Sequence, residues 1–354
     1  MDRSGRGMIG FACAYTPLPL IDAAGFTPYR ILPVTAAPDH AGVLLHDNIC
    51  PHVKRVLDRA LAKDLPPLAG VVFMNSCEAM RRLADAWRVA LPEMPVLVVD
   101  LPTTADHAAG SYFTSELKKL WKWLNDLGGT SPGGDAIEVG VSRYNELYAK
   151  LDLLRRDLGA GRLAGGRGAL QEAVNMSVTL PLAEAALRID EMYSRAPGSG
   201  NVTGVPVYLF GNVLADPASF ALFENAGCAV VGDDLCTGLK QIPFIGLDDV
   251  ADPFEQIAGG LLGRPPCARF LCGSAPGSYA TNVADSARLA GARGVIAHVM
   301  KFCDPYLSRL PTIRETLRRS SLPMLVLEGD CSARSFGQQR TRVEAFAEML
   351  GGGR

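Results

Sequence analysis

Short, nearly continuous apolar runs alternate with helix-like segments along much of this chain. The runs lie at 69–74, 95–99, 205–210, 229–231, 295–299 and 324–327, with a further possible strand at 268–272. Such runs are typical of parallel strands that are covered on both faces. From Glu78 to Leu91, apolar residues recur every three to four positions, which predicts a helix between the first two strands. Further helices are expected at 217–226, 306–320 and 341–350.

The middle of the chain has a different pattern. Leu117, Leu120 and Leu124 share one helical face, and helical spacing returns at 138–158 and 169–195. We therefore predict an α/β protein with two Rossmann-like or flavodoxin-like domains and mostly parallel sheets. The domains are expected at 1–113 and 201–354, joined by a helical segment at 114–200. The alternation also suggests a coarse duplication of two α/β halves, which the sequence alone does not establish.

Composition and charge narrow the class of protein. Of 354 residues, 48% are apolar and 20% charged, and the formal net charge is -2, so the chain lacks the basic excess of a nucleic-acid-binding protein. No apolar stretch is long enough to span a membrane. The segment after the N-terminus is interrupted by Pro17 and Pro19, unlike a secretory signal. We expect a cytoplasmic protein that binds neither nucleic acid nor membrane.

The nine cysteines require an explanation in a cytoplasmic chain, where stable disulfides are rare. They can be buried thiols, metal ligands or reactive thiols. Burial is the ordinary outcome for a cysteine. We expect it for Cys13, and we expect packing or incidental roles for Cys228, Cys267, Cys272 and Cys331.

Three other cysteines share a local setting. Cys50 lies just before a predicted helix, while Cys77 and Cys303 follow the predicted strands 69–74 and 295–299. In open α/β sheets, ligands bind beyond the carboxyl ends of strands, and free N–H groups at helix starts favour thiolates. Three such thiolates could hold an iron–sulfur cluster. No Cys-x-x-Cys pair is present, however, so spacing alone favours scattered buried thiols.

An ordered set of motifs adds a resemblance. The set comprises FACAYTP at 11–17, CPHV at 50–53, NSCEAMRR at 75–82, GDDLCTG at 232–238, KFCDP at 301–305 and GQQRTRVEAF at 337–346. Over nearly its whole length, the chain resembles the 2-hydroxyacyl-CoA dehydratase and benzoyl-CoA reductase family. The resemblance implies α/β domains around a [4Fe–4S] cluster, with Cys50, Cys77 and Cys303 as its ligands.

The same resemblance implies a function. In that family a separate ATP-hydrolysing activator supplies low-potential electrons. Dehydratases then expel hydroxide from a 2-hydroxyacyl-CoA through a ketyl radical, and benzoyl-CoA reductases reduce an aromatic ring. The leading expectation is an iron–sulfur subunit that dehydrates or reduces an acyl-CoA, beside a paralogous subunit or a second copy of itself. The alternatives are a homodimeric reductase of a small molecule with a double-cubane [8Fe–9S] cluster, and a non-catalytic electron-relay or scaffold subunit.

Several residues near the motifs qualify this expectation. Pro19 stands where family dehydratases commonly have a glutamate, and the missing acid argues against dehydration by this chain alone. Asp233 and Asp234 are the candidate catalytic carboxylates, or else they cap a helix. Beside them, Cys236 could line the substrate space. His52 could donate to a cluster sulfide, although an exposed histidine is the simpler expectation.

Overall fold

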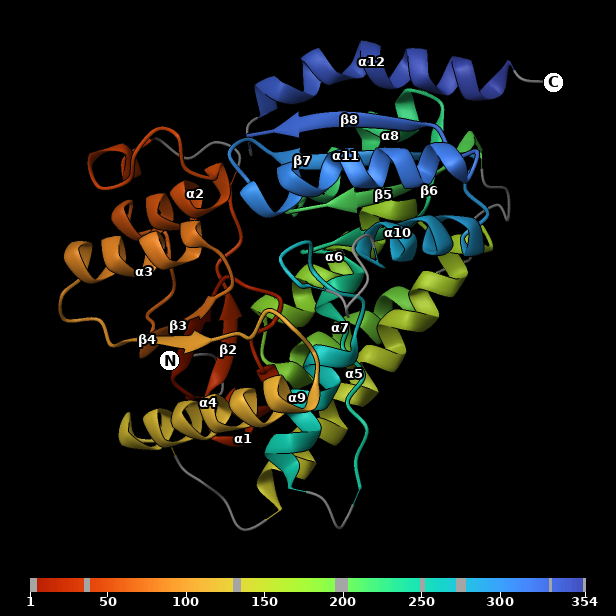
Figure 1. Ribbon diagram of the computed structural model, residues 1–354. Coiled ribbons are helices and arrows are strands. Elements are labelled where there is room, and N and C mark those ends of the chain that lie inside the picture. The colour runs from red at the N-terminus through yellow and green to blue at the C-terminus, as the bar shows by residue number, and fades with distance from the viewer. Residues whose placement is uncertain are drawn as a thin grey trace.

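Two four-stranded parallel sheets form the framework of the molecule (Figure 1). The structure, a computed structural model, describes residues 5–34, 39–129, 135–194, 203–248, 252–271, 278–330 and 333–352. The first sheet has the order β2-β1-β3-β4 and the second β6-β5-β7-β8. Their strands are β1 Met8–Phe11, β2 Thr27–Arg30, β3 Gly70–Asn75, β4 Val96–Asp100, β5 Val205–Gly211, β6 Cys228–Leu235, β7 Gly294–Met300 and β8 Met324–Gly329.

The two sheets repeat one topology, because in each the first strand lies between the second and the third. Every pair of neighbouring strands is parallel. The predicted α/β class with parallel sheets is therefore confirmed, and the matching strand orders support the suggested duplication. We call each sheet with its covering helices a lobe.

Helices cover both faces of the first sheet, as its apolar strands require. On one face lie α2 (Pro51–Leu61) and α3 (Glu78–Ala90), where Trp87 packs edge-on against Phe73 with ring centroids 5.3 Å apart. On the other lie α1 (Leu18–Ala23) and α4 (His107–Asp126).

The second sheet is covered in the same way. One face packs against α10 (Ser278–Leu289) and α11 (Asp304–Arg319), and the other against α8 (Ala221–Asn225) and α12 (Ala333–Gly351). α12 begins earlier than the helix predicted at 341–350. Three 3₁₀ helices lie in the connections, η1 Ala41–Val43, η2 Pro217–Phe220 and η3 Leu239–Gln241.

The middle of the chain forms a helical layer with a core of its own. It consists of α5 (Ala136–Gly159), α6 (Gly166–Thr179) and α7 (Leu182–Tyr193). The helical stretch expected at 169–195 is two helices, because Pro181 cannot continue the first. The predicted boundary at 113/114 falls inside α4, which packs against β4 and α1 of the first lobe and against a helix from the second half of the chain.

One segment of the second half returns to the first lobe. α9 (Pro253–Gly263) packs against α4, where Phe254 meets Trp121 edge-on and Asp252 pairs with Lys118 at 2.7 Å. The strand predicted at 268–272 is wrong for residues 268–271, which form a turn and an irregular segment. There the Leu271 N–H donates to the Thr103 carbonyl at 2.7 Å, so this segment crosses the first lobe instead of joining a sheet.

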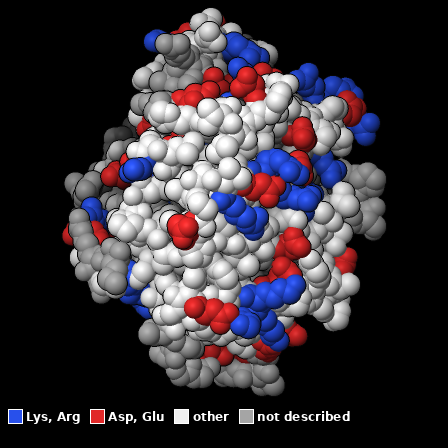
Figure 2. All heavy atoms as spheres, turned by 90° about the vertical axis from the view of Figure 1, so that its left-hand side faces the viewer, with Lys and Arg blue, Asp and Glu red and all other residues white. Residues whose placement is uncertain are grey.

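The surface agrees with the balanced charge of the sequence. On the side of α2 and α3, Figure 2 shows acidic and basic side chains mixed around a broad uncharged area, without a continuous basic patch. Ion pairs within α3, such as Arg82 with Glu78 at 2.7 Å, account for part of that mixing. Among the described residues, no helix combines the length and the apolar character that crossing a membrane requires.

Gly211 provides a direct test of how closely the strands of the second sheet approach each other. It ends β5 with φ of 143°, and a Cβ there would lie 1.8 Å from the His298 carbonyl oxygen on β7. We expect Gly211→Ala to lower the free energy of unfolding by about 3 kcal/mol or more, through backbone strain and a steric clash. Chemical denaturation measures this change.

Gly110→Ala is the matched control. Gly110 lies within α4, and no atom would come within 4 Å of an added Cβ. This change should be neutral or stabilise the chain by up to about 1 kcal/mol, since alanine has the higher helix propensity. Equal effects of the two substitutions would contradict the close approach at Gly211.

Candidate metal centre

A cavity of about 480 Å³ lies between the two lobes, where the carboxyl ends of both sheets meet. From the first sheet, its walls comprise Ala12–Tyr15 after β1 and Ser76–Met80 after β3. From the second, they comprise Asn212 and Val213 after β5 and Phe302–Tyr306 after β7. Its position is the one where open parallel sheets bind ligands.

Six cysteines line this cavity: Cys13, Cys50, Cys77, Cys236, Cys267 and Cys303. The structure thus brings the three predicted ligands together and adds three further thiols to them. Cys228 lies apart, in the core of the second lobe. Cys272 and Cys331 lie outside the described residues.

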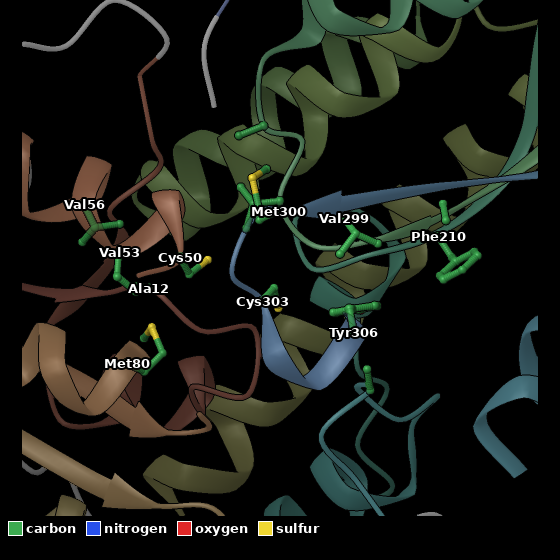
Figure 3. Close-up of a cluster of buried hydrophobic side chains, with 14 of the residues drawn as sticks. Ala12, Cys50, Val53, Val56, Met80, Phe210, Val299, Met300, Cys303 and Tyr306 are labelled. Carbon is green, nitrogen blue, oxygen red and sulfur yellow. The ribbon is translucent and has the colours of Figure 1, made fainter. Parts of the chain in front are cut away.

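Each of the three predicted ligands occupies the N-cap of a helix. Cys50 precedes α2, Cys77 precedes α3 and Cys303 precedes α11. Figure 3 shows Cys50 and Cys303 on either side of the space between the lobes, with Met80 nearby. Free N–H groups and the positive end of the helix dipole stabilise a thiolate at such a position.

Without a bound metal, burial keeps the Cys77 thiol protonated, and a neighbouring thiol together with burial keeps the Cys303 thiol protonated. Burial raises the pKa of Cys77 to about 12, against a smaller lowering by the Met80 backbone N–H. The adjacent Cys50 thiol, and then burial, raise the pKa of Cys303, while the Asn212 amide lowers it. Metal binding would therefore release protons from these cysteines.

The other three thiols have a different electrostatic environment. The neighbouring Cys236 thiol is the main cause that lowers the pKa of Cys267, to about 6, and Lys240 acts in the same direction. Buried Arg30 faces Cys13 and Cys236, and burial lowers its pKa to about 10 while these thiols oppose that shift. The neighbouring Cys267 thiol, and then burial, raise the pKa of Cys236, so Arg30 faces a protonated thiol there. Its guanidinium would balance the negative charge that this sulfur gains on binding a metal.

Arg30 and Arg264 also fix the cavity walls. Arg30, at the end of β2, donates to the Cys236 carbonyl at 2.8 Å and to the Gln241 side chain in the second lobe. Arg264, after α9, donates to the Ala14 carbonyl at 3.0 Å in the first lobe and to the Lys240 carbonyl at 2.6 Å. Within the described ranges neither arginine pairs with a carboxylate.

The two candidate catalytic carboxylates lie behind the wall and are not among the cavity-lining residues. Asp233 pairs with buried Arg167 at 2.6 Å and accepts the backbone N–H groups of Leu235 and Leu239, both at 3.1 Å. Asp234 pairs with Lys240 and accepts the Tyr279 hydroxyl at 3.1 Å. These contacts hold the loop after β6, so the capping alternative fits Asp233, while catalysis by either carboxylate stays a prediction.

The structure also places Pro19 and His52, two further residues that the sequence singled out. Pro19 is buried on α1, which packs against α5, and does not line the cavity. The bearing of Pro19 on dehydration therefore stays a prediction. The expectation of an exposed His52 is wrong, because His52 is only 8% exposed and lines the cavity. Burial lowers the pKa of His52 to about 3, so it is neutral.

Sequence reasoning missed the acids that do line the cavity. Glu78 and Asp304 directly follow Cys77 and Cys303 at the starts of α3 and α11. A hydrogen bond from Arg82 is the main cause that lowers the pKa of Glu78, which is therefore ionised. Their positions beside the proposed ligands were the signal that could have found them.

The thiols fit a polynuclear cluster better than a single ion. In the part of the chain that the structure describes, no three His, Cys, Asp or Glu side chains converge on one metal ion. Four of the sulfur donors instead lie in two contacting pairs, Cys50 with Cys303 and Cys236 with Cys267. Thiolate donors also match the ligand preference of iron–sulfur clusters.

Comparison of the sequence with known proteins points to one family. The family model described as 2-hydroxyglutaryl-CoA dehydratase, D-component, matches residues 13–350. The chain is 24% identical to the beta subunit of (R)-2-hydroxyglutaryl-CoA dehydratase of Acidaminococcus fermentans, covering 98% of this chain and 93% of that protein.

Other relatives have different substrates in their names. The (R)-phenyllactyl-CoA dehydratase beta subunit of Clostridium sporogenes is 21% identical, covering 99% of this chain and 93% of that protein. A benzoyl-CoA reductase subunit of Thauera aromatica is also 21% identical, covering 98% of this chain and 91% of that protein. All three named relatives are subunits of enzymes.

Proposed function

The chain belongs to the 2-hydroxyglutaryl-CoA dehydratase D-component family, and from that premise we propose that it is the iron–sulfur subunit of a dehydratase or reductase that acts on an acyl-CoA. The observation that carries the proposal is the position of Cys50, Cys77 and Cys303, each at a helix N-cap and all on one cavity. These three cysteines would hold a [4Fe–4S] cluster, which supplies one-electron transfer when bound.

The other cavity residues have roles that follow from their chemistry. Glu78 and Asp304 lie beside the proposed ligands, where a carboxylate can accept or return a proton. Arg269 and Arg309 line the same cavity and donate to backbone carbonyls, Arg269 to that of Leu101 at 2.6 Å. Neither has a carboxylate partner among the described residues, so both can bind the anionic groups of a CoA thioester.

The proposal also includes two protein partners, an electron donor and a companion subunit. We infer a separate ATP-dependent activator as electron donor, and a paralogous subunit or a second copy of this chain as companion, in the cytoplasm. The chain lacks the Gly-x-x-x-x-Gly-Lys-Ser/Thr motif with which a phosphate-binding loop would hold ATP. This absence supports an ATPase on a separate protein.

Single Cys→Ala changes at positions 50, 77 and 303 test the ligand set. After anaerobic reconstitution, each variant should hold about tenfold less iron or lower. Even changes to residues that only support metal ligands cost about 10–100-fold in affinity. Iron and sulfide analysis with electron paramagnetic resonance provides the measurement.

Cys228→Ala is the matched control, because Cys228 is buried in the second lobe and away from the cavity. Its iron content should equal that of the wild type. Full iron in the Cys303→Ala variant would overturn the ligand assignment.

The activator has its own test. We expect the cluster of the purified chain to stay oxidised with ATP alone, and to be reduced when the activator and ATP are both present. A non-hydrolysable ATP analogue should prevent that reduction, which absorption spectroscopy follows. ATP hydrolysis and reduction of the cluster by the chain alone would contradict the proposal.

The six thiols of the cavity favour a second candidate, a reductase of a small molecule with a double-cubane [8Fe–9S] cluster. Cys13, Cys236 and Cys267 lie together, with Cys236 and Cys267 in mutual contact and Arg30 beside them. Three such thiolates could hold a second cubane beside the first.

Iron content distinguishes the two candidates. A double-cubane chain should bind about eight irons, and Cys236→Ala should lower that number toward about four. A chain with one [4Fe–4S] cluster should bind about four irons, unchanged by Cys236→Ala. The latter result would exclude the second candidate.

A further inference from the structure

Asn212 connects the two groups of thiols in the cavity. It follows β5 directly, lines the cavity and is only 8% exposed. Its side-chain Oδ1 accepts the Met300 backbone N–H at 2.9 Å, and its Nδ2 donates to Cys303 Sγ at 2.9 Å. Its backbone carbonyl accepts the Cys236 N–H at 2.8 Å.

The orientation of this amide follows from its partners. A backbone N–H can only donate, so the oxygen of Asn212 has to face Met300. The amide NH₂ group is then directed at the sulfur of Cys303. The opposite orientation would set the NH₂ group against the Met300 N–H, two donors that cannot bond.

The backbone holds Asn212 in place independently of its side chain. Its N–H donates to the His298 carbonyl at 3.1 Å, beside the close approach of Gly211 to β7. Asn212 is thus held through its backbone N–H by His298 and through its side-chain oxygen by Met300, and both partners belong to β7. A donor fixed in this way needs little reorganisation when the charge on the sulfur changes.

We propose that Asn212 is a positioning residue that sets the reduction potential of the cluster held by Cys303, by donating a hydrogen bond to that ligand sulfur. The inference rests on the proposed function. A hydrogen bond to a cluster sulfur stabilises the more negative, reduced state and raises the potential. In the described ranges, no other side-chain nitrogen donates to Cys50, Cys77 or Cys303, so Asn212 distinguishes one ligand from the other two.

Asn212→Asp is the sharpest test, because the carboxylate keeps the acceptor for Met300 and replaces the donor with an acceptor of similar shape. The reconstituted variant should retain its iron. At a fixed ambient potential, its ratio of reduced to oxidised cluster should fall by about tenfold or more, which corresponds to about 59 mV for one electron. A potentiometric titration followed by electron paramagnetic resonance measures the ratio.

Two further variants separate the hydrogen bond from other effects. Asn212→Ala removes the donor without adding charge, and should shift the potential in the same direction by a smaller amount. Asn212→Ala also provides the test of the reduction potential if the Asn212→Asp variant does not retain iron. Asn175→Asp adds the same charge on α6, where Asn175 donates to the Ala215 carbonyl outside the cavity lining, and should leave the potential unchanged.

The outcomes identify which idea fails. Retained iron with an unchanged potential in Asn212→Ala overturns the role of Asn212 and leaves the proposed function intact. An equal shift in Asn175→Asp also overturns it, since charge at a distance would then explain the effect. A wild-type chain that binds no iron overturns the proposed function and this inference together.

Discussion

Two buried guanidinium groups join the two lobes by hydrogen bonds beside the cavity. Arg30 belongs to the first lobe and donates to the second, while Arg264 belongs to the second half of the chain and donates to the first. A buried cation is costly unless its donors are satisfied and its charge is balanced. Backbone carbonyls accept from Nη1 of both groups and from Nη2 of Arg30, whereas Nε of both groups and Nη2 of Arg264 have no hydrogen-bond partner among the described residues. The Arg264 guanidinium also lies 3.6 Å above the centre of the Tyr15 ring.

Repetition of one simple topology explains why the chemistry gathers at this junction. Parallel strands place their carboxyl ends at one edge, and the helices that follow present free N–H groups there. Because each lobe does this and the two edges face each other, donors from distant parts of the chain share one space. Cys77 and Cys303 hold equivalent positions, each at the helix start after the third strand of its sheet.

The two sides of the cavity differ in their electrostatics. Beside Cys13 and Cys236, buried Arg30 supplies a full positive charge. Beside Cys303, the neutral amide of Asn212 supplies a directed hydrogen bond. A charge acts over several ångströms on every nearby sulfur, whereas an amide acts on the one sulfur that it contacts. Groups bound on the two sides would therefore experience different fields within one cavity.

The sequence by itself determined the elements and the family. Apolar runs such as 69–74 and 295–299 are typical of buried strands, and both are strands in the structure with a helix after each, so Cys77 and Cys303 lie at strand ends as predicted. The short strands β1 and β2 were not predicted, and in β2 the polar Thr27 and charged Arg30 leave no apolar run to mark the strand. Cys267 was taken for a packing residue, because no strand or helix start marks it; only the crossing of its segment over the first lobe brings it to the cavity. Likewise, the positions of His52, Pro19 and Arg30 relative to the cavity depend on how the lobes pack. The spacing of apolar residues indicates which face of a helix or strand is buried. Only the tertiary structure decides which other elements that face packs against, because those elements come from distant parts of the chain.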